Sequence, residues 1–248
     1  MSKYNYGWKK TPGGLTLKKF SESKFFKVME LAPLLDLRGV DSVILDQGQL
    51  GSCTGNGIAG CINFLHVKTG ETFSRLFVYY NERAIEGTVD QDSGANIDDG
   101  INSVKTQGVC LESVWPYDIT QFTVKPSDEA YAQASKDVVT DYLQVNSLAE
   151  VKMCLAAKFP VVFGINIYES FEDDAVATSG HVPVPQPNEQ CLGGHCMKIV
   201  GYDDVNQWVI VANSWGTGWG DKGYCYLPYP YILSDASDFA TIRKDTGE

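Results

Sequence analysis

The sequence predicts an α+β fold, with helices in the first half of the chain and mainly strands in the second. Helix signals gather between residues 53 and 108. Short apolar and β-branched runs follow at 161–167, 196–202, 207–212 and 223–227, and these read as strands. The length of 248 residues suits a single unit built from two packed halves.

Three helices are predicted in the first half. The first covers 53–68, ends before Gly70 and has its buried face at Ile58, Cys61, Ile62 and Leu65, which follow i, i+3, i+4, i+7 spacing. Ser74 is placed to cap the second helix and Gly87 to end it. The third helix is expected over 97–107, with Gly108 after its last residue.

The second half mixes two helices with strands. A helix is expected around 127–136 and a strand over 138–143. The pair Ser147 and Glu150 is a capping-box signature for a helix to about residue 158. Residues 168–194 are rich in acidic residues and prolines and show little periodicity, so they are predicted to form a long loop that leads to His195 at the start of a strand.

Charge and hydropathy exclude several classes of protein. The chain has 20 Lys and Arg against 31 Asp and Glu, and a net charge of −11 disfavours binding to nucleic acid or to an anionic membrane. No apolar run has the length of a membrane span or of a signal peptide, which predicts an intracellular protein. An acidic surface could attract cationic peptides, but solubility is the simpler explanation.

Seven cysteines leave six if one is a nucleophile, so three disulfides are arithmetically possible. A reducing compartment favours free thiols instead. Four of the cysteines lie in apolar surroundings and read as core residues: Cys61, Cys110, Cys154 and Cys225. Cys191 and Cys196 flank a Gly-Gly-His run, where free thiols are the simplest interpretation and a local bridge or metal site is an alternative.

Four polar residues could together form a thiol acyl-transfer site. Cys53 stands at the expected start of a helix, where the helix dipole favours a thiolate nucleophile. His195 could exchange its proton, and the side-chain oxygen of Asn213 could hold the imidazole in one tautomer. Gln47 and the backbone N–H of Cys53 could donate to an oxyanion. The other histidines, His66 and His181, are interpreted as structural or solvent-facing.

Around these residues the chain resembles the papain-like cysteine peptidases. Residues 47–54 read Gln-Gly-Gln-Leu-Gly-Ser-Cys-Thr, close to the family motif Gln-Gly-x-Cys-Gly-Ser-Cys-Trp. Residues 213–220 read Asn-Ser-Trp-Gly-Thr-Gly-Trp-Gly, and His195 precedes a Val-Gly-Tyr run at 200–202. The order Cys, His, Asn and the spacing of about 140 residues between Cys53 and His195 also agree with the family.

The resemblance implies a papain-like fold with two lobes and a cleft between them. The catalytic domain would cover 36–248, with a helical lobe at about 36–125 and a β-rich lobe at about 126–248. Leu50 stands where the family has a disulfide cysteine, and Thr54 replaces the aromatic residue after the nucleophile. The first change predicts a framework that does not depend on the usual bridges.

The resemblance also implies a substrate-binding cleft. Gly94 is expected to bond the substrate backbone on one side, and Gly194 to offer its carbonyl on the other. A turn glycine is the alternative for both. Trp215 would cover the hydrogen bond between Asn213 and His195 and shield it from water.

The predicted function is hydrolysis of peptide bonds in peptide or protein substrates through an acyl-thioenzyme. No metal or organic cofactor is implied. Acyl transfer to an amine, or isopeptide cleavage, is an alternative reaction because a thioester can be captured by nucleophiles other than water. A catalytically inactive papain-like binding protein is a further alternative.

Residues 1–35 precede the resemblance and are shorter than the family's usual propeptide. Their aromatic residues and apolar end predict that they pack on the domain. They could form a structural arm, which is the favoured interpretation, or a short cover that limits access to Cys53.

Overall fold

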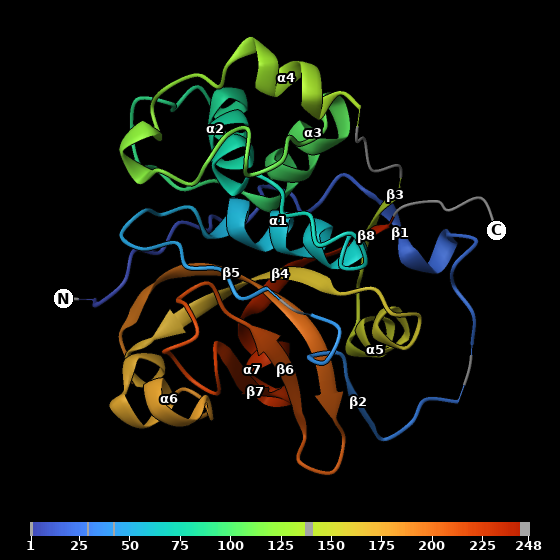
Figure 1. Cartoon of the computed structure of the whole chain (residues 1–248). Coiled ribbons are helices and arrows are strands. Elements are labelled where there is room, and N and C mark those ends of the chain that lie inside the picture. Colours follow the sequence, from blue (N-terminus) through green and yellow to red (C-terminus); the bar gives the residue numbers. More distant parts are fainter. Residues whose placement is uncertain (1, 29, 42, 137–140, 244–248) are drawn as a thin grey trace.

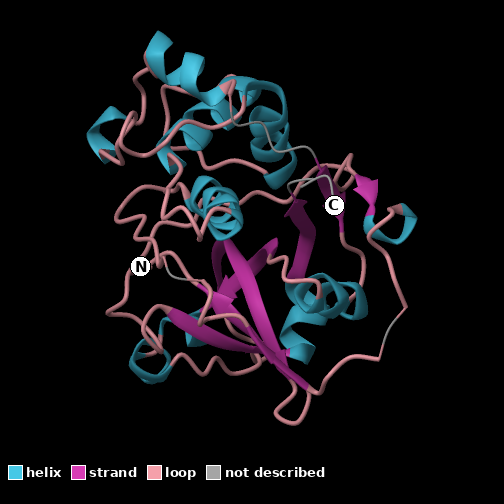
Figure 2. Cartoon of the chain, turned by 45° about the vertical axis from the view of Figure 1, so that its right-hand side comes forward, coloured by secondary structure: helices cyan, strands magenta, loops and turns pink. Residues whose placement is uncertain are grey.

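The computed structural model describes residues 2–28, 30–41, 43–136 and 141–243 of the chain. The helices within residues 75–134 lie on one side, and a twisted sheet with the remaining helices lies on the other; helix α1 (Cys53–Leu65) lies between them (Figure 1). The dark-blue N-terminal segment runs between these two layers. Figure 2 shows the same division by secondary structure after a 45° turn. The α+β architecture predicted from the sequence is confirmed.

The described helices are α1 (Cys53–Leu65), α2 (Arg75–Glu86), α3 (Ile97–Gln107), α4 (Asp128–Ala134), α5 (Leu148–Ala156), α6 (Asp174–Ser179) and α7 (Tyr229–Asp235), with 3-10 turns at Phe20–Glu22, Ile119–Gln121 and Glu169–Glu172. The five predicted helices are present as α1 to α5, whereas α6 and α7 were not predicted. The predicted caps form as expected: Ser74 accepts a hydrogen bond from the Phe77 N–H, and Gly87 ends α2 at a φ of 70°. Ser147 likewise accepts from the Glu150 N–H.

The strands form one sheet among the described residues, in the order β1-β3-β8-β4-β5-β6-β7, with β2 paired to β5. They are β1 (Lys18–Lys19), β2 (Leu34–Asp36), β3 (Asp141–Gln144), β4 (Val161–Tyr168), β5 (Cys191–Asp203), β6 (Trp208–Ala212), β7 (Tyr224–Pro228) and β8 (Ala236–Arg243). The first half of the predicted 138–143 strand lies outside the described residues; β3 covers its second half.

Two sequence predictions in the β-rich half were wrong. His195 lies in the middle of β5, because this strand begins at Cys191 and pairs with β4 as far as Tyr168. The segment 168–194 is therefore not one loop: it holds a 3-10 turn, α6 and the start of β5. The prolines and acidic residues of this segment leave no periodic pattern from which short elements can be predicted. Instead, α6 packs against the 3-10 turn, a contact that does not depend on sequence periodicity.

Helix α1 is the centre of the molecule and packs against both layers. Ile58 and Ile62 are fully buried in an apolar cluster with residues of α2 and α3. A Cβ at Gly55 would lie 2.6 Å from the Arg75 carbonyl oxygen of α2. On the other side, a Cβ at Gly57 would lie 2.8 Å from Sγ of Cys196 on β5. The helix thus carries glycines, despite their low helix propensity, because its neighbours approach closely on both sides.

Helix α4 follows the predicted lobe boundary at about residue 125 but lies with α2 and α3 in Figure 1. The ring of Tyr131 on α4 packs against Phe77 of α2, with 5.0 Å between centroids. None of the described helices is long and apolar enough to cross a membrane. All seven cysteines are free thiols, and Cys61, Cys110, Cys154 and Cys225 are buried, as predicted for core residues.

Candidate active site

Cys53 is the first residue of α1 and has no solvent exposure. Burial raises the pKa of its thiol to about 12, although hydrogen bonds from the backbone of Cys196 and of Gly7 act in the opposite direction. The Cys196 contact places the sulfur beside the residue that follows His195. In this conformation Cys53 is a neutral thiol, despite its favourable position at a helix N-terminus.

His195 and Asn213 come together through the pairing of β5 with β6. Nε2 of His195 and Oδ1 of Asn213 are 2.8 Å apart, and Oδ1 also accepts the Ser214 N–H. Because an amide oxygen can only accept, the bond assigns the imidazole proton to Nε2 and leaves Nδ1 as an acceptor. Nδ1 is buried without a hydrogen-bond partner among the described residues. Burial lowers the pKa of His195 to about 4, which keeps the ring neutral.

Trp215 covers this pair as the sequence predicted. Its ring lies over the His195 ring with 5.0 Å between centroids and 25° between planes. Trp219 packs edge-on against Trp215, again at 5.0 Å. The hydrogen bond between His195 and Asn213 is therefore enclosed by aromatic rings, where it is stronger than in water.

Gln47 is held by Ser214, a contact that the sequence analysis did not single out. The Ser214 hydroxyl donates to Oε1 of Gln47 over 2.7 Å, and the Gln47 N–H donates to the Ser214 carbonyl over 2.8 Å. The amide nitrogen Nε2 is thereby directed away from Ser214, and it donates to the carbonyls of Asn5 and Leu50 at 3.0 Å each. The serine of the Asn-Ser-Trp motif was the one sequence feature that could have indicated this contact.

The N-terminal segment lies across these residues as an extended peptide. The Trp8 N–H donates to the Gly194 carbonyl on one wall over 2.9 Å. On the other wall the Ala95 N–H donates to the Gly7 carbonyl over 2.8 Å, and the Lys9 N–H donates to the Ala95 carbonyl over 2.9 Å. Residues 2–9, called the cleft segment below, thus bridge β5 and the loop before α3.

The two predicted substrate-binding glycines behave differently. Gly194 offers its carbonyl to a peptide backbone, as expected. Gly94 makes no such bond: its N–H donates to the Tyr79 hydroxyl, and Ala95 makes the backbone pairs instead. Gly94 permits close approach, because a Cβ there would lie 1.9 Å from the Gly7 carbonyl oxygen. Substrate binding by Gly94, Gly194 and Trp215 remains a prediction.

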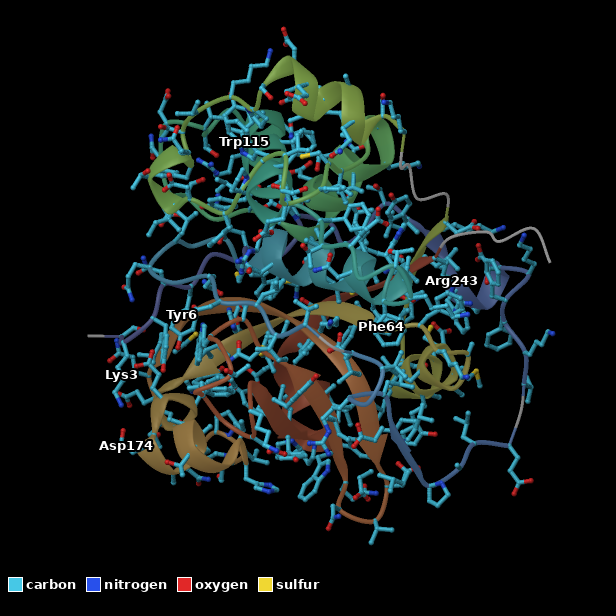
Figure 3. All side chains as sticks on the ribbon, in the orientation of Figure 1. Lys3, Tyr6, Phe64, Trp115, Asp174 and Arg243 are labelled. Atoms are coloured by element: carbon cyan, nitrogen blue, oxygen red, sulfur yellow. The ribbon has the colours of Figure 1, made fainter. Side chains whose placement is uncertain are left out.

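Aromatic and acidic side chains anchor the start of the cleft segment. The Tyr4 ring stacks on Trp215 with 3.6 Å between centroids, and the Tyr6 ring lies edge-on to His195 at 5.8 Å. The Tyr6 hydroxyl donates to the carboxylate of Glu172 over 2.7 Å, and the Lys3 N–H donates to the same carboxylate over 2.9 Å. Figure 3 shows Lys3 and Tyr6 on the same side of the molecule, with Lys3 beside Asp174.

Two glycines mark the tightest contacts in the cleft. A Cβ on Gly7 would lie 1.6 Å from the carbonyl oxygen of Gly51, which leads into α1. A Cβ on Gly164 of β4 would lie 1.9 Å from the Trp8 indole, and its three nearest atoms all belong to that ring. The cleft segment therefore fits only because both positions lack a side chain.

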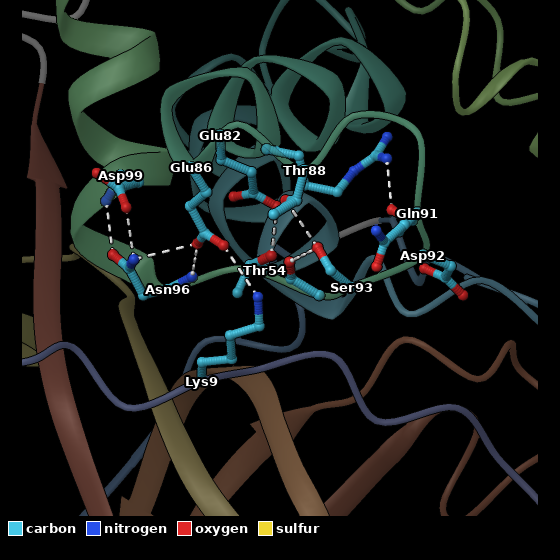
Figure 4. Close-up of polar contacts among 12 residues, drawn as sticks. Lys9, Thr54, Glu82, Glu86, Thr88, Gln91, Asp92, Ser93, Asn96 and Asp99 are labelled. Carbon is cyan, nitrogen blue, oxygen red and sulfur yellow. Dashed lines mark hydrogen bonds and ion pairs between the residues drawn. The ribbon is translucent and has the colours of Figure 1, made fainter.

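Next to Cys53 in the sequence, Thr54 contacts a buried carboxyl group that sequence reasoning missed. The Thr54 hydroxyl donates to Glu82 of α2 (Figure 4). Desolvation raises the pKa of Glu82 well above its ordinary value and so favours the neutral form of this carboxyl. Thr54, which replaces the motif's aromatic residue, thus has a polar partner inside the helical lobe. No group of three or more His, Cys, Asp or Glu residues within the described ranges is placed to hold a metal ion.

The order, geometry and enclosure of these residues fit one family, and the comparison with known families agrees. Residues 35–230 match the papain family cysteine proteases. The chain belongs to the papain family of cysteine peptidases. The cysteine, histidine, asparagine and glutamine identified above all lie within the matched range.

Curated relatives support the same assignment. The chain is 38% identical over 251 residues to an uncharacterized peptidase C1-like protein of Acanthamoeba polyphaga mimivirus, covering 93% of this chain and 81% of that protein. It is 31% identical over 191 residues to cysteine proteinase 2 of Entamoeba histolytica, covering 73% of this chain and 58% of that protein.

Solved structures agree on the fold. Xylellain, a cysteine protease from Xylella fastidiosa, superimposes with a TM-score of 0.88 at 35% identity, covering 98% of this chain and 97% of that one. The digestive procathepsin L 3 of Tenebrio molitor gives a TM-score of 0.69 at 20% identity and covers 96% of this chain, which supports the fold alone.

Proposed function

We propose that this papain-family peptidase cleaves peptide bonds through an acyl-thioenzyme. The Cys53 thiol gives its proton to Nδ1 of His195, and the sulfur attacks the carbonyl carbon of the scissile bond. As the tetrahedral intermediate collapses, the C–N bond breaks and the amine leaves with the proton from His195. Water, deprotonated by His195, then attacks the thioester, which releases the acid and restores the Cys53 thiol.

Two further residues support these steps. Asn213 accepts from Nε2 of His195 and so holds Nδ1 toward the nucleophile through both proton transfers. Nε2 of Gln47 and the backbone N–H of Cys53 donate to the oxyanion of the tetrahedral intermediate. The buried bond from Ser214 to Gln47 fixes this amide before substrate arrives, so little reorganisation accompanies the reaction.

The observation that carries the proposal is the position of the cleft segment. An extended peptide already lies on the site, with its backbone bonded to Gly194 on one wall and Ala95 on the other. The Asn5 carbonyl accepts from Gln47, which is where an oxyanion would need a donor. A cleft that holds one peptide in this way is suited to peptide substrates.

The cleft segment itself is proposed to be an inhibitor rather than a substrate. In a peptide bound for cleavage, the carbonyl group that accepts from Gln47 must also be the one whose carbon contacts the Cys53 sulfur. Here the backbone group of this segment that contacts the Cys53 sulfur belongs to Gly7, two residues beyond the Asn5 carbonyl that Gln47 binds. The segment excludes solvent from Cys53 and His195 without presenting a carbonyl for attack, so the resting protein would be latent.

The proposal is tested by covalent labelling and by cleavage. In a full-length Gly7→Ala protein, which should displace the cleft segment, an epoxysuccinyl probe should modify Cys53, and fluorogenic peptides should be hydrolysed to free acid and amine. Trapping the thioester by acid quench and mass spectrometry would identify Cys53 as the acylated residue. Cleavage that persists in Gly7→Ala/Cys53→Ala would contradict the mechanism.

A further inference from the structure

The N-terminal segment and the rest of the chain have opposite charge. Residues 1–20 contain five lysines and no aspartate or glutamate, whereas the whole chain has a net charge of −11. Hydrogen bonds from backbone and side-chain groups of this segment end on carboxylates of the domain: Glu172, Asp174, Glu86, Asp238 and Asp98. The cleft that this segment covers is therefore flanked by acidic groups.

One of these carboxylates is positioned by the domain itself. Glu86 is the last residue of α2, and its Oε1 accepts from the backbone N–H of Asn96 at 3.0 Å and from the Asn96 side chain at 3.1 Å. Asn96 in turn caps α3 by accepting from the Asp99 N–H over 2.8 Å. Both bonds to Glu86 use Oε1, so they fix the carboxylate while leaving Oε2 for another donor (Figure 4).

The second oxygen holds a lysine of the cleft segment. Nζ of Lys9 lies 2.9 Å from Oε2 of Glu86, whose side chain is only 14% exposed. The Lys9 backbone donates to the carbonyl of Ala95, the neighbour of Asn96. A short stretch before α3 thus orients both the peptide backbone and the carboxylate that receives its side chain. An acidic group at a helix C-terminus is unfavourable by itself, which increases its attraction for a cation.

The neighbouring residue sets the register of this contact. Trp8 is buried, and its ring lies against Gly164 of β4 with no room for a Cβ between them. The space that the Trp8 ring fills against Gly164 is called the Trp8 pocket. An aromatic side chain in this pocket brings the adjacent residue to Glu86. When the segment leaves, the pocket and the carboxylate are exposed together.

We propose that Glu86 is a specificity-determining residue that selects peptides with a lysine or arginine next to the residue filling the Trp8 pocket. This inference rests on the proposed peptidase function and names its substrate class as cationic peptides. The contact supplies a charge-assisted hydrogen bond to a carboxylate that needs no rearrangement, so it favours a basic residue over an uncharged one of similar length.

The experiment compares matched peptides in one enzyme. Internally quenched peptides built around a tryptophan would carry Lys, Arg or Gln on either side of it, and kcat/KM would be measured with full-length Gly7→Ala protein. The ratio for Lys over Gln cancels the fraction of molecules with an open cleft, because both peptides meet the same open enzyme. We expect a preference of about threefold to tenfold on one side of the tryptophan, and a smaller one at high salt.

The variant that tests the role of Glu86 carries Glu86→Gln together with Gly7→Ala. Glutamine keeps an oxygen for Asn96 but loses the charge, so the ratio should fall to within about twofold. Glu71→Gln makes the same chemical change near the far end of α1 and should leave the ratio unchanged. A parent without a preference for Lys or Arg, or a preference that survives Glu86→Gln, would overturn the inference.

Two measurements keep the inference separate from the proposed function. The first uses Gly7→Ala/Cys53→Ala protein and a dye-labelled peptide copying residues 2–11, with Lys or Gln at position 9. The Lys peptide should bind about threefold to tenfold more tightly by fluorescence anisotropy even if no peptide is cleaved. Equal affinities would overturn the inference, whereas Lys-dependent binding without cleavage would count against only the proposed function.

The second is a double-mutant cycle in the intact chain. Lys9→Gln and Glu86→Gln should each accelerate alkylation of Cys53, because each weakens docking of the cleft segment. If the two groups act through each other, the double variant should be no faster than the faster single one. Independent, multiplying effects would show that Glu86 does not recognise the lysine.

Discussion

The two walls of the cleft are built in different ways. On the helical wall, Gln47 and Cys53 lie six residues apart and are positioned by one turn and the start of α1. On the sheet wall, His195 lies in β5 and Asn213 directly follows β6, and the pairing of Lys198 with Ala212 brings them together. The position of Cys53 therefore depends on local geometry and that of His195 on strand register, where a slip of one residue would turn His195 to the other face.

Removing the central group of either wall tests whether both are needed. In the Gly7→Ala background, whose cleft is open, Cys53→Ala and His195→Ala should each lower peptide cleavage by several orders of magnitude, since neither nucleophile nor base acts alone. Both should keep the native fold by circular dichroism. His66→Ala and His181→Ala serve as controls and should remain active. Turnover by Cys53→Ala within about tenfold of the parent would refute its role.

Gln47→Ala probes the helical wall without touching the nucleophile. The loss of one of two oxyanion donors should lower kcat by roughly two to three orders of magnitude, with a small change in KM. Steady-state kinetics on a single fluorogenic peptide would measure both. An unchanged kcat would place Gln47 outside the oxyanion hole.

Asn213→Ala is the matching change on the sheet wall and should cost less. His195 remains in place through β5 but loses the acceptor that sets its tautomer, a hydrogen bond of about 1.5–3 kcal/mol when the ring is charged. We expect kcat/KM to fall by about tenfold to a hundredfold. A loss as large as that of His195→Ala would mean that strand register alone does not hold the imidazole.

Gly7→Ala tests the peptide that joins the two walls. Its Cβ would lie 1.6 Å from a backbone oxygen, so the cleft segment should be displaced. The rate of Cys53 alkylation by iodoacetamide at neutral pH should rise by at least about tenfold, because an exposed thiol at a helix N-terminus regains thiolate character. Gly39→Ala is the matched control, since a Cβ there meets nothing within 4 Å. Loss of thermal stability without a gain in reactivity would assign the segment a purely structural role.

The smallest effect expected is a dependence of docking on pH. The pKa of His195 is about 4 under the segment against an ordinary 6.5, so docking should weaken as the pH falls from about 6.5 to about 4, where only the open form binds the proton. The pKa of Cys53 is about 12 against 9.0, so docking should also weaken as the pH rises from about 9 toward 12.

Acrylamide quenching of Trp8, taken as the difference between wild type and Trp8→Phe, would follow the opening of the cleft across this range. Cys53→Ala should remove the alkaline limb and keep the acid one. Quenching that stays flat from pH 4 to pH 9 would show that burial of His195 is independent of the segment.

Much of the molecule was accessible from sequence because its signals are local. The caps at Ser74 and Gly87 depend on residues within a few positions, and both form as expected. The papain-like fold and the family followed from three motifs in the correct order, and both are confirmed. The catalytic roles of Cys53, His195, Asn213 and Gln47 remain predictions, although the structure joins His195 to Asn213 and brings both Gln47 and His195 against residues 2–9.

The tertiary structure decided what depends on residues far apart in the chain. The sequence allowed the N-terminal segment to be a structural arm or a cleft cover, and the structure shows contacts of both kinds. Phe20 is buried in the core, whereas residues 2–9 cross the candidate active site. The contacts of Ser214 with Gln47, Glu82 with Thr54 and Glu86 with Lys9 leave no periodic or local pattern, because each joins elements that only the completed fold brings together.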